Sequence, residues 1–341
     1  MVRNYRLDNI KILMVFFVVF GHLIEPLILQ NQIIKTIWVW IYTFHMPVFV
    51  MVAGMLSKAE YGHDFLLKQT KTIFVPFVIF TIGYEVFHLL LNGTISNYGI
   101  NFQPYWILWF LFSLFVWRLT LPLVLKFRHP IVIAIFISLL AGYIDPIGRT
   151  MGISRTLYFF PFFIFGHIIL PKFLVFIENI TLPKYLFRCL LWCGLAISMV
   201  AVLNLQSFSH KWVLGSHAYI FVGSDVWYVG VYRLGLYGLS FFVSLIVIGL
   251  IPYRKLRLTS KGKNSLYIYL WHGFVVKALI AVGLMNVIGA LPTYVSLLVL
   301  FLMSIGLTFI LSLNFLGALT EQYLFNPIRN NLPKGIVRET L

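Results

Sequence analysis

The chain has 341 residues, of which 60% are hydrophobic and 18% aromatic, whereas only 11% carry a charge. A soluble globular protein is about half apolar and about a quarter charged, so this composition excludes a disordered chain, a collagen and a disulfide-stapled miniprotein, and it indicates an integral membrane protein. The net charge of +16 does not indicate a nucleic-acid partner, because the basic residues form no block and instead mark the ends of apolar runs.

Apolar stretches of about 20 residues, the length that crosses a bilayer as a helix, follow one another along the chain. Ten are predicted, at residues 10–29, 37–57, 72–91, 106–125, 131–144, 157–177, 186–205, 234–251, 265–290 and 294–316. The fifth is short for a full crossing. We therefore expect an all-α, polytopic membrane bundle of about ten transmembrane helices, forming a single membrane domain over residues 1–341.

The distribution of Lys and Arg between the loops predicts the orientation. If the N-terminus lies inside, 19 of these residues fall in inner segments and five in outer segments. Cytoplasmic loops are enriched in Lys and Arg, so both termini are expected to be cytoplasmic. The first apolar run holds His22 and Glu25 and is followed by no small-residue cleavage site, so we do not interpret it as a cleaved signal peptide.

The first predicted span carries four ionisable residues, namely Asp8, Lys11, His22 and Glu25. Eleven residues of an α-helix end roughly 20° beyond three full turns, so Lys11 and His22 share a face, with His22 about 16 Å further along the axis. Asp8 and Glu25 join this face because each is three residues from its neighbour. The spacing therefore predicts one polar stripe on the first helix.

Two interpretations of the stripe remain open at this stage. Ionisable groups inside a span are costly and usually face a polar interior. Lys11 could hold an anionic cytoplasmic donor, and His22, oriented by Glu25, could act as a general base on an acceptor that enters from outside. Alternatively, Asp8 and Lys11 form an interfacial ion pair, and His22 makes a hydrogen bond between helices.

Other ionisable residues fall inside or beside later spans. His45, two residues before a proline, and His272 are candidates for lining a cavity, and Arg118 is expected to face the interior. Three membrane histidines could suggest a metal site, but no pair with metal-ligand spacing occurs on one helix, so no metal is predicted. Arg149 and Arg155 flank the outer end of the sixth span, where they either hold an acidic or hydroxylated acceptor or anchor the protein at the headgroups.

The opening segment, Tyr5-Arg6-Leu7-Asp8-Asn9-Ile10-Lys11 followed by Gly21-His22, resembles the first helix of the membrane-bound acyltransferase 3 family, particularly its fucose 4-O-acetylase-like branch. In that family a basic residue precedes a histidine by ten intervening residues. Most relatives have Arg where this chain has Lys11, and a lysine binds phosphate as a point charge rather than bidentately. Further similar segments follow in order over essentially the whole chain: Phe44-His45-Met46-Pro47-Val48-Phe49, Ala53-Gly54, Trp109-Phe110-Leu111, Ser154-Arg155-Thr156-Leu157, Phe160-Pro161-Phe162-Phe163, Gly166, Asn264-Ser265-Leu266-Tyr267 and His272-Gly273.

The resemblance implies a multi-pass protein of the bacterial cytoplasmic membrane that transfers an acyl group, usually acetyl, from cytoplasmic acyl-CoA to a hydroxyl of an extracytoplasmic glycan or lipid-linked saccharide. Lys11, with Arg6 and Asp8 nearby, would meet the phosphate-bearing end of CoA. His22 would deprotonate the sugar hydroxyl or, as a less favoured route, accept the acyl group itself. Glu25 would fix the tautomer of His22.

The resemblance also gives roles to the remaining candidates. His45, Arg118, Arg155 and His272 would line the cavity or stabilise developing charge. The alternative function, from a different class, is a polysaccharide or lipid-linked saccharide exporter, which needs a polar route but no base on the first helix. The sequence leaves open whether copies of the chain form a homo-oligomer, because small residues on lipid-facing surfaces cannot be told apart from internal packing.

Overall fold

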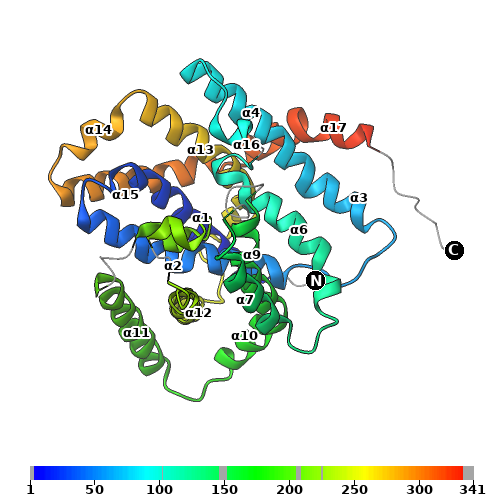
Figure 1. Ribbon diagram of the computed structural model, residues 1–341, viewed down its shortest axis with the longest axis vertical. Coiled ribbons are helices and arrows are strands. Elements are labelled where there is room, and N and C mark those ends of the chain that lie inside the picture. The colour runs from blue at the N-terminus through cyan, green and yellow to red at the C-terminus, as the bar shows by residue number, and fades with distance from the viewer. Residues whose placement is uncertain (1–3, 102, 146–151, 205–208, 224–225, 333–341) are drawn as a thin grey trace.

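The computed structural model describes residues 4–101, 103–145, 152–204, 209–223 and 226–332, and within these ranges all regular structure is helical (Figure 1). The longer helices are α1 (Tyr5–Ile24), α2 (Gln32–Met55), α4 (Val75–Asn92), α6 (Trp109–Val124), α7 (Pro130–Ala141), α9 (Ile153–Ile168), α10 (Leu170–Glu178), α11 (Lys184–Asn204), α12 (Gly230–Leu250), α13 (Ser265–Ala281) and α15 (Thr293–Leu311). The short helical segments are η1 (Glu25–Leu27), α3 (Phe65–Gln69), η2 (Thr70–Phe74), α5 (Asn97–Ile100), η3 (Trp106–Leu108), η4 (His210–Leu214), η5 (Tyr219–Val222), η6 (Thr259–Asn264), α14 (Leu284–Gly289), α16 (Asn314–Leu319), η7 (Thr320–Phe325) and α17 (Asn326–Asn331).

Seven of these helical runs are long and apolar enough to cross a membrane, and the bent pair α9–α10 makes an eighth if it is one span. Each of the ten predicted segments contains helix, but α7 has only 12 residues, α9 and α10 are bent by 52°, and α13 has 17 residues. The described residues thus establish an all-helical, multi-pass protein. The expected count of about ten spans and the side on which the termini lie are not confirmed by these lengths.

The middle of the bundle is formed by α1 and α2, the first of which packs against α2, α13 and α15 (Figure 1). Close contact between α2 and α9 depends on two glycines. A Cβ atom on Gly54 would overlap the carbonyl of Phe163, and one on Gly166 would overlap the backbone of Met51. Because neither glycine has a side chain, the two helix backbones can touch there.

The start of α1 is fixed by the loop that follows α12. The Asn9 side-chain amide donates to the carbonyls of Pro252 and Arg254, at 2.9 and 3.0 Å, and its oxygen accepts from the Thr259 hydroxyl at 2.6 Å. We call this end of the bundle the Lys11 end. The opposite end of α1, together with η1, η3, η4 and η5, forms the His22 end.

Candidate active site

The candidate pair of His22 and Glu25 lies where α1 gives way to η1. His22 is in the last turn of α1, Glu25 opens η1, and Pro26 follows immediately. The His22 Nδ1 atom lies 2.7 Å from Glu25 Oε2. Since an ionised carboxylate can only accept, Nδ1 carries the proton and donates it, and in the neutral imidazole Nε2 then keeps its lone pair.

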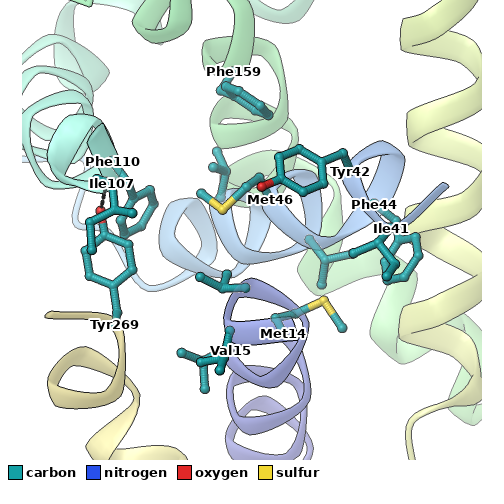
Figure 2. Close-up of a cluster of buried hydrophobic side chains, with 14 of the residues drawn as sticks. Met14, Val15, Ile41, Tyr42, Phe44, Met46, Ile107, Phe110, Phe159 and Tyr269 are labelled. Atoms are coloured by element: carbon teal, nitrogen blue, oxygen red, sulfur yellow. Dashed lines mark hydrogen bonds between the residues drawn. The ribbon is translucent and has the colours of Figure 1, made fainter. Parts of the chain in front are cut away.

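His22 and Glu25 line a cavity of about 230 Å³, which we call the histidine cavity. Tyr42 and Met46 of α2 and Phe159 of α9 contribute to its wall, and Figure 2 shows these three side chains facing the same region. Figure 2 also shows Tyr269, which lines the cavity from α13 and donates a hydrogen bond to the Ile107 carbonyl. His22 thus faces a cavity whose wall combines apolar and aromatic side chains with ionisable ones such as Glu25 and His45.

Trp106 forms another wall of the histidine cavity and has an unusual backbone. Its φ is +30°, and it is the non-glycine residue with positive φ among those the structure describes. Such a conformation is strained for a bulky residue and persists only where the surroundings impose it. The indole ring lies 4.6 Å from the His22 ring, between centroids, and the Lys277 Nζ atom sits 4.8 Å from the centre of the indole. The strained turn therefore places Lys277 and His22 next to one aromatic ring.

Arg155 places a cation in the wall of the histidine cavity. Its guanidinium lies 5.3 Å from the Trp109 ring centre, and its Nη atoms make only long contacts, at 3.5 Å, with the Trp106 carbonyl and the Ser216 hydroxyl. Its Nε atom is buried and has no hydrogen-bond partner. Buried donors are normally satisfied, so this guanidinium has capacity to bind a further oxygen. The Glu25 carboxylate interacts electrostatically with both Arg155 and Lys277.

A second hollow, of about 330 Å³, adjoins the histidine cavity and shares Trp106, Trp109 and Arg155 with it; we call it the vestibule. His217 lines both hollows, and its Nδ1 atom lies 2.8 Å from the Ser216 hydroxyl. Burial, reinforced by the positive charges of Arg155 and Lys211, lowers the pKa of His217 to about 4. The vestibule therefore offers a neutral imidazole, a hydroxyl and indole rings, groups that suit a polyhydroxylated ligand.

The two other predicted histidines lie close to His22. His45 lines the histidine cavity, and its Nδ1 donates to the Ile41 carbonyl at 2.8 Å. His272 is fully buried and stacks on His22 with 5.5 Å between ring centroids. Its Nδ1 donates to the Ile268 carbonyl, and its Nε2 has no partner. Neither histidine can donate from Nε2 while neutral.

Within the described ranges, no three His, Cys, Asp or Glu side chains are grouped so that they could hold a metal ion.

The candidates predicted for the donor lie at the other end of α1. Lys11 Nζ is 2.7 Å from Asp8 Oδ1, and both side chains are mostly buried. Arg6 is 4% exposed, but it points to a different side of the helix and donates to the carbonyls of Ile248 and Gly249 at the end of α12, at 2.9 and 3.4 Å. It is therefore not next to Lys11 on the face that leads to His22.

Arg118 lies away from the histidine cavity. It donates from Nε to the Ser57 hydroxyl at 3.2 Å and from Nη1 to the Gln69 side-chain oxygen at 3.1 Å. These partners belong to a separate hollow of about 300 Å³, so the structure does not bring Arg118 together with His45, Arg155 and His272. Arg149 falls outside the described residues.

Several site residues were missed by sequence reasoning. Lys277 is an ionisable residue inside a predicted span, which is the same signal that identified His22, and it could have been found in that way. Trp106 reads from sequence as an interfacial aromatic residue, and nothing in the sequence marks its positive φ. Tyr42, whose hydroxyl lies 3.5 Å from His22 Nδ1, and His217 depend on contacts between distant segments.

The comparison with protein families adds an independent finding. A family model for an acyltransferase domain, that of acyltransferase 3, matches residues 4–313. The chain belongs to the acyltransferase 3 family. No curated protein and no solved structure matches it. As an acyltransferase 3 protein with several membrane-crossing helices, it is a membrane acyltransferase, and every residue of the histidine cavity lies within the matched range.

Proposed function

We propose that this acyltransferase 3 protein transfers an acyl group, with acetyl expected, from cytoplasmic acyl-CoA to a hydroxyl of an extracytoplasmic glycan or lipid-linked saccharide. The observation that carries the proposal is the His22–Glu25 pair, at 2.7 Å, which in the neutral imidazole directs the lone pair to Nε2, beside a cavity with aromatic walls. A fixed imidazole of this kind is the usual general base for activating a hydroxyl.

The chemistry follows from the placement of charges around His22. The acceptor hydroxyl gives its proton to His22 Nε2 while its oxygen attacks the carbonyl carbon of the thioester. The negative charge that develops on the carbonyl oxygen would be stabilised by Arg155, whose Nε has no partner, or by Lys277. When the intermediate collapses, the C–S bond breaks and the thiolate takes the proton back from Nε2. Atoms and charge balance without a metal or a redox group.

The donor and the acceptor would approach His22 from opposite ends of α1. Lys11, held by Asp8 at 2.7 Å, would attract the phosphates of acyl-CoA at the Lys11 end, which we propose is cytoplasmic. The vestibule at the His22 end offers indole rings and Arg155, which suit a saccharide by stacking and by hydrogen bonding to its hydroxyls. The fucose 4-O-acetylase-like resemblance is consistent with such an acceptor.

The test is NMR of the surface glycan from a deletion strain complemented with one of three genes. The wild-type gene and His63→Ala should restore the acyl signals, whereas His22→Ala should leave the glycan present but unacylated. His63 is the matched control because its side chain is 74% exposed and pairs with Asp64 in a loop. Loss of the glycan itself with His22→Ala, at normal protein level, would favour an exporter and contradict the proposal.

A further inference from the structure

A third hollow, of about 530 Å³, lies at the Lys11 end and shares no lining residue with the histidine cavity or the vestibule. It is formed where α10 turns into α11 and where α12 ends. Four basic side chains line it, together with one acid, Glu178: Arg6, Lys184, Arg188 and Arg254. We call it the Arg6 cavity. Its lining therefore carries a clear excess of positive charge.

Arg6 is the buried residue among these four. The charge and the hydrogen-bond donors of its guanidinium are only partly satisfied by neighbouring groups. Its side chain is 5% exposed, and its Nη1 lies 3.9 Å from Glu178, whose own side chain is 53% exposed. Its Nη2 donates to two backbone carbonyls of α12, at 2.9 and 3.4 Å, but its Nε is buried and has no partner. A buried guanidinium is stable only when it is paired and hydrogen-bonded. The cavity is thus a place where an anion would complete the coordination of Arg6.

The remaining lining residues indicate what carries that anion. Apolar side chains share the cavity with the basic ones, among them Leu182, Phe187 and Leu250. α11 itself is packed loosely against the rest of the bundle, with only Gly194, Ser198 and Val202 buried, and it lies at the edge of the molecule in Figure 1. A helix exposed in this way on a membrane protein faces lipid, so the cavity borders the bilayer.

We propose that the Arg6 cavity binds the phosphate of an anionic phospholipid, with its acyl chains against the apolar residues at the start of α11. Guanidinium and ammonium groups bind phosphate oxygens strongly, and basic pockets between helices at the cytoplasmic side are suited to anionic headgroups. The lipid would seal the gap between α10, α11 and α12. A nucleotide phosphate, such as that of acyl-CoA, has the same charged chemistry but lacks the paired chains that the apolar wall would contact.

The experiment measures thermal stability of the purified full chain in detergent. Dioleoyl phosphatidylglycerol should raise the Tm of the wild type more than dioleoyl phosphatidylcholine does, because a ligand of the native state stabilises it. The Lys184→Gln/Arg188→Gln variant should lose this difference. Both residues are exposed, so the variant should fold, whereas removing the buried Arg6 could unfold the chain.

The matched control is Lys255→Gln/Arg257→Gln, which removes two exposed basic residues of the neighbouring loop that do not line the cavity. It should keep the phosphatidylglycerol effect. An equal loss of the phosphatidylglycerol effect in both variants would mean that the lipid is attracted to basic surface residues in general, and this would overturn the proposal. The absence of any phosphatidylglycerol effect on the Tm of the wild type would overturn it as well. A Tm rise with free coenzyme A instead, lost only in Lys184→Gln/Arg188→Gln, would make the cavity a nucleotide site and would contradict the lipid assignment. Since no readout is catalytic, failure here leaves the proposed acyl transfer untouched.

Discussion

Each end of α1 has an acid–base pair of side chains, and the two pairs lie in different surroundings. At one end Asp8 and Lys11, and at the other His22 and Glu25, form an acid–base pair three residues apart with a contact of 2.7 Å. The first pair lies beside η6, whose Gly262 packs directly on the Asp8 backbone. The second pair lines the histidine cavity together with two indole rings and Arg155, and Lys277 lies over one of these indoles. The pairs match in geometry, so their difference lies in what surrounds them.

The comparison indicates that the spacing of three residues brings an acid and a base into contact, whereas the side chains of neighbouring helices determine what chemistry that contact can support. The ammonium of Lys11 has no lone pair to act as a base while it is charged, so the pair at its end can attract an anion but cannot activate a hydroxyl. In the neutral imidazole of His22, Nε2 keeps its lone pair because the proton stays on Nδ1, which donates it to Glu25. We therefore expect changes at the His22 end to reduce turnover, and changes at the Lys11 end to weaken donor binding.

The largest effect below the loss of His22 itself is expected for Glu25→Gln. The amide can donate as well as accept, so it no longer holds His22 in one tautomer, and kcat should fall about 100-fold with little change in the KM for acetyl-CoA. Steady-state transfer assays in membranes measure this. Asp64→Asn alters an exposed imidazole–carboxylate pair, His63–Asp64 at 3.3 Å, and should leave kcat unchanged. A Glu25→Gln enzyme with normal kcat would show that the pair is only structural.

An intermediate effect is expected for Arg155→Ala. Arg155 lines both the histidine cavity and the vestibule, and a hydrogen bond to a charged group contributes enough for about a tenfold fall in kcat/KM for the acceptor when it is lost. The assay would use unacylated glycan extracted from the deletion strain at increasing concentrations. Arg128→Ala, in an exposed loop, is the control. A rise in the KM for acetyl-CoA with an unchanged acceptor KM would place Arg155 on the donor route instead.

The smallest effect is expected for Lys11→Ala. The Lys11 side chain is 24% exposed, so solvent weakens its attraction for an anion; the KM for acetyl-CoA should rise only a few-fold while kcat is kept, and Lys11→Arg should restore it. The difference between Lys11→Ala and wild type should shrink as salt is added, because screening weakens charge attraction. A fall in kcat at unchanged KM would break the proposed division between the two ends of α1.

The sequence predicts the polar features of α1 well because they depend on a single helix. The first span is helical from Tyr5, and the expected contact between His22 and Glu25 is confirmed at 2.7 Å. The position of Arg6 could also have been predicted, since five residues at 100° each place it about 140° around the helix from Lys11. Local spacing is thus enough wherever both partners lie on one helix.

The rest of the site depends on contacts between helices, which spacing does not determine. Arg118 is inside the bundle, but its guanidinium donates hydrogen bonds to Ser57 and Gln69 and therefore lies at a hollow separate from the histidine cavity. Lys277 becomes relevant only because the strained turn at Trp106 places the indole beside it. The bend between α9 and α10 could likewise not be predicted, because residues 157–177 form one continuous apolar run and are predicted as a single span.

The central claim is that His22 receives the hydroxyl proton for a donor supplied from the Lys11 end. The most direct test uses sealed inside-out membrane vesicles with [¹⁴C]acetyl-CoA added outside, and it follows label into the glycan fraction. Wild type and His63→Ala should incorporate label equally, while His22→Ala and His22→Gln, at equal protein level, should fall by at least about 100-fold, the contribution of a general base. Incorporation by the His22 variants within about threefold of wild type would contradict the account.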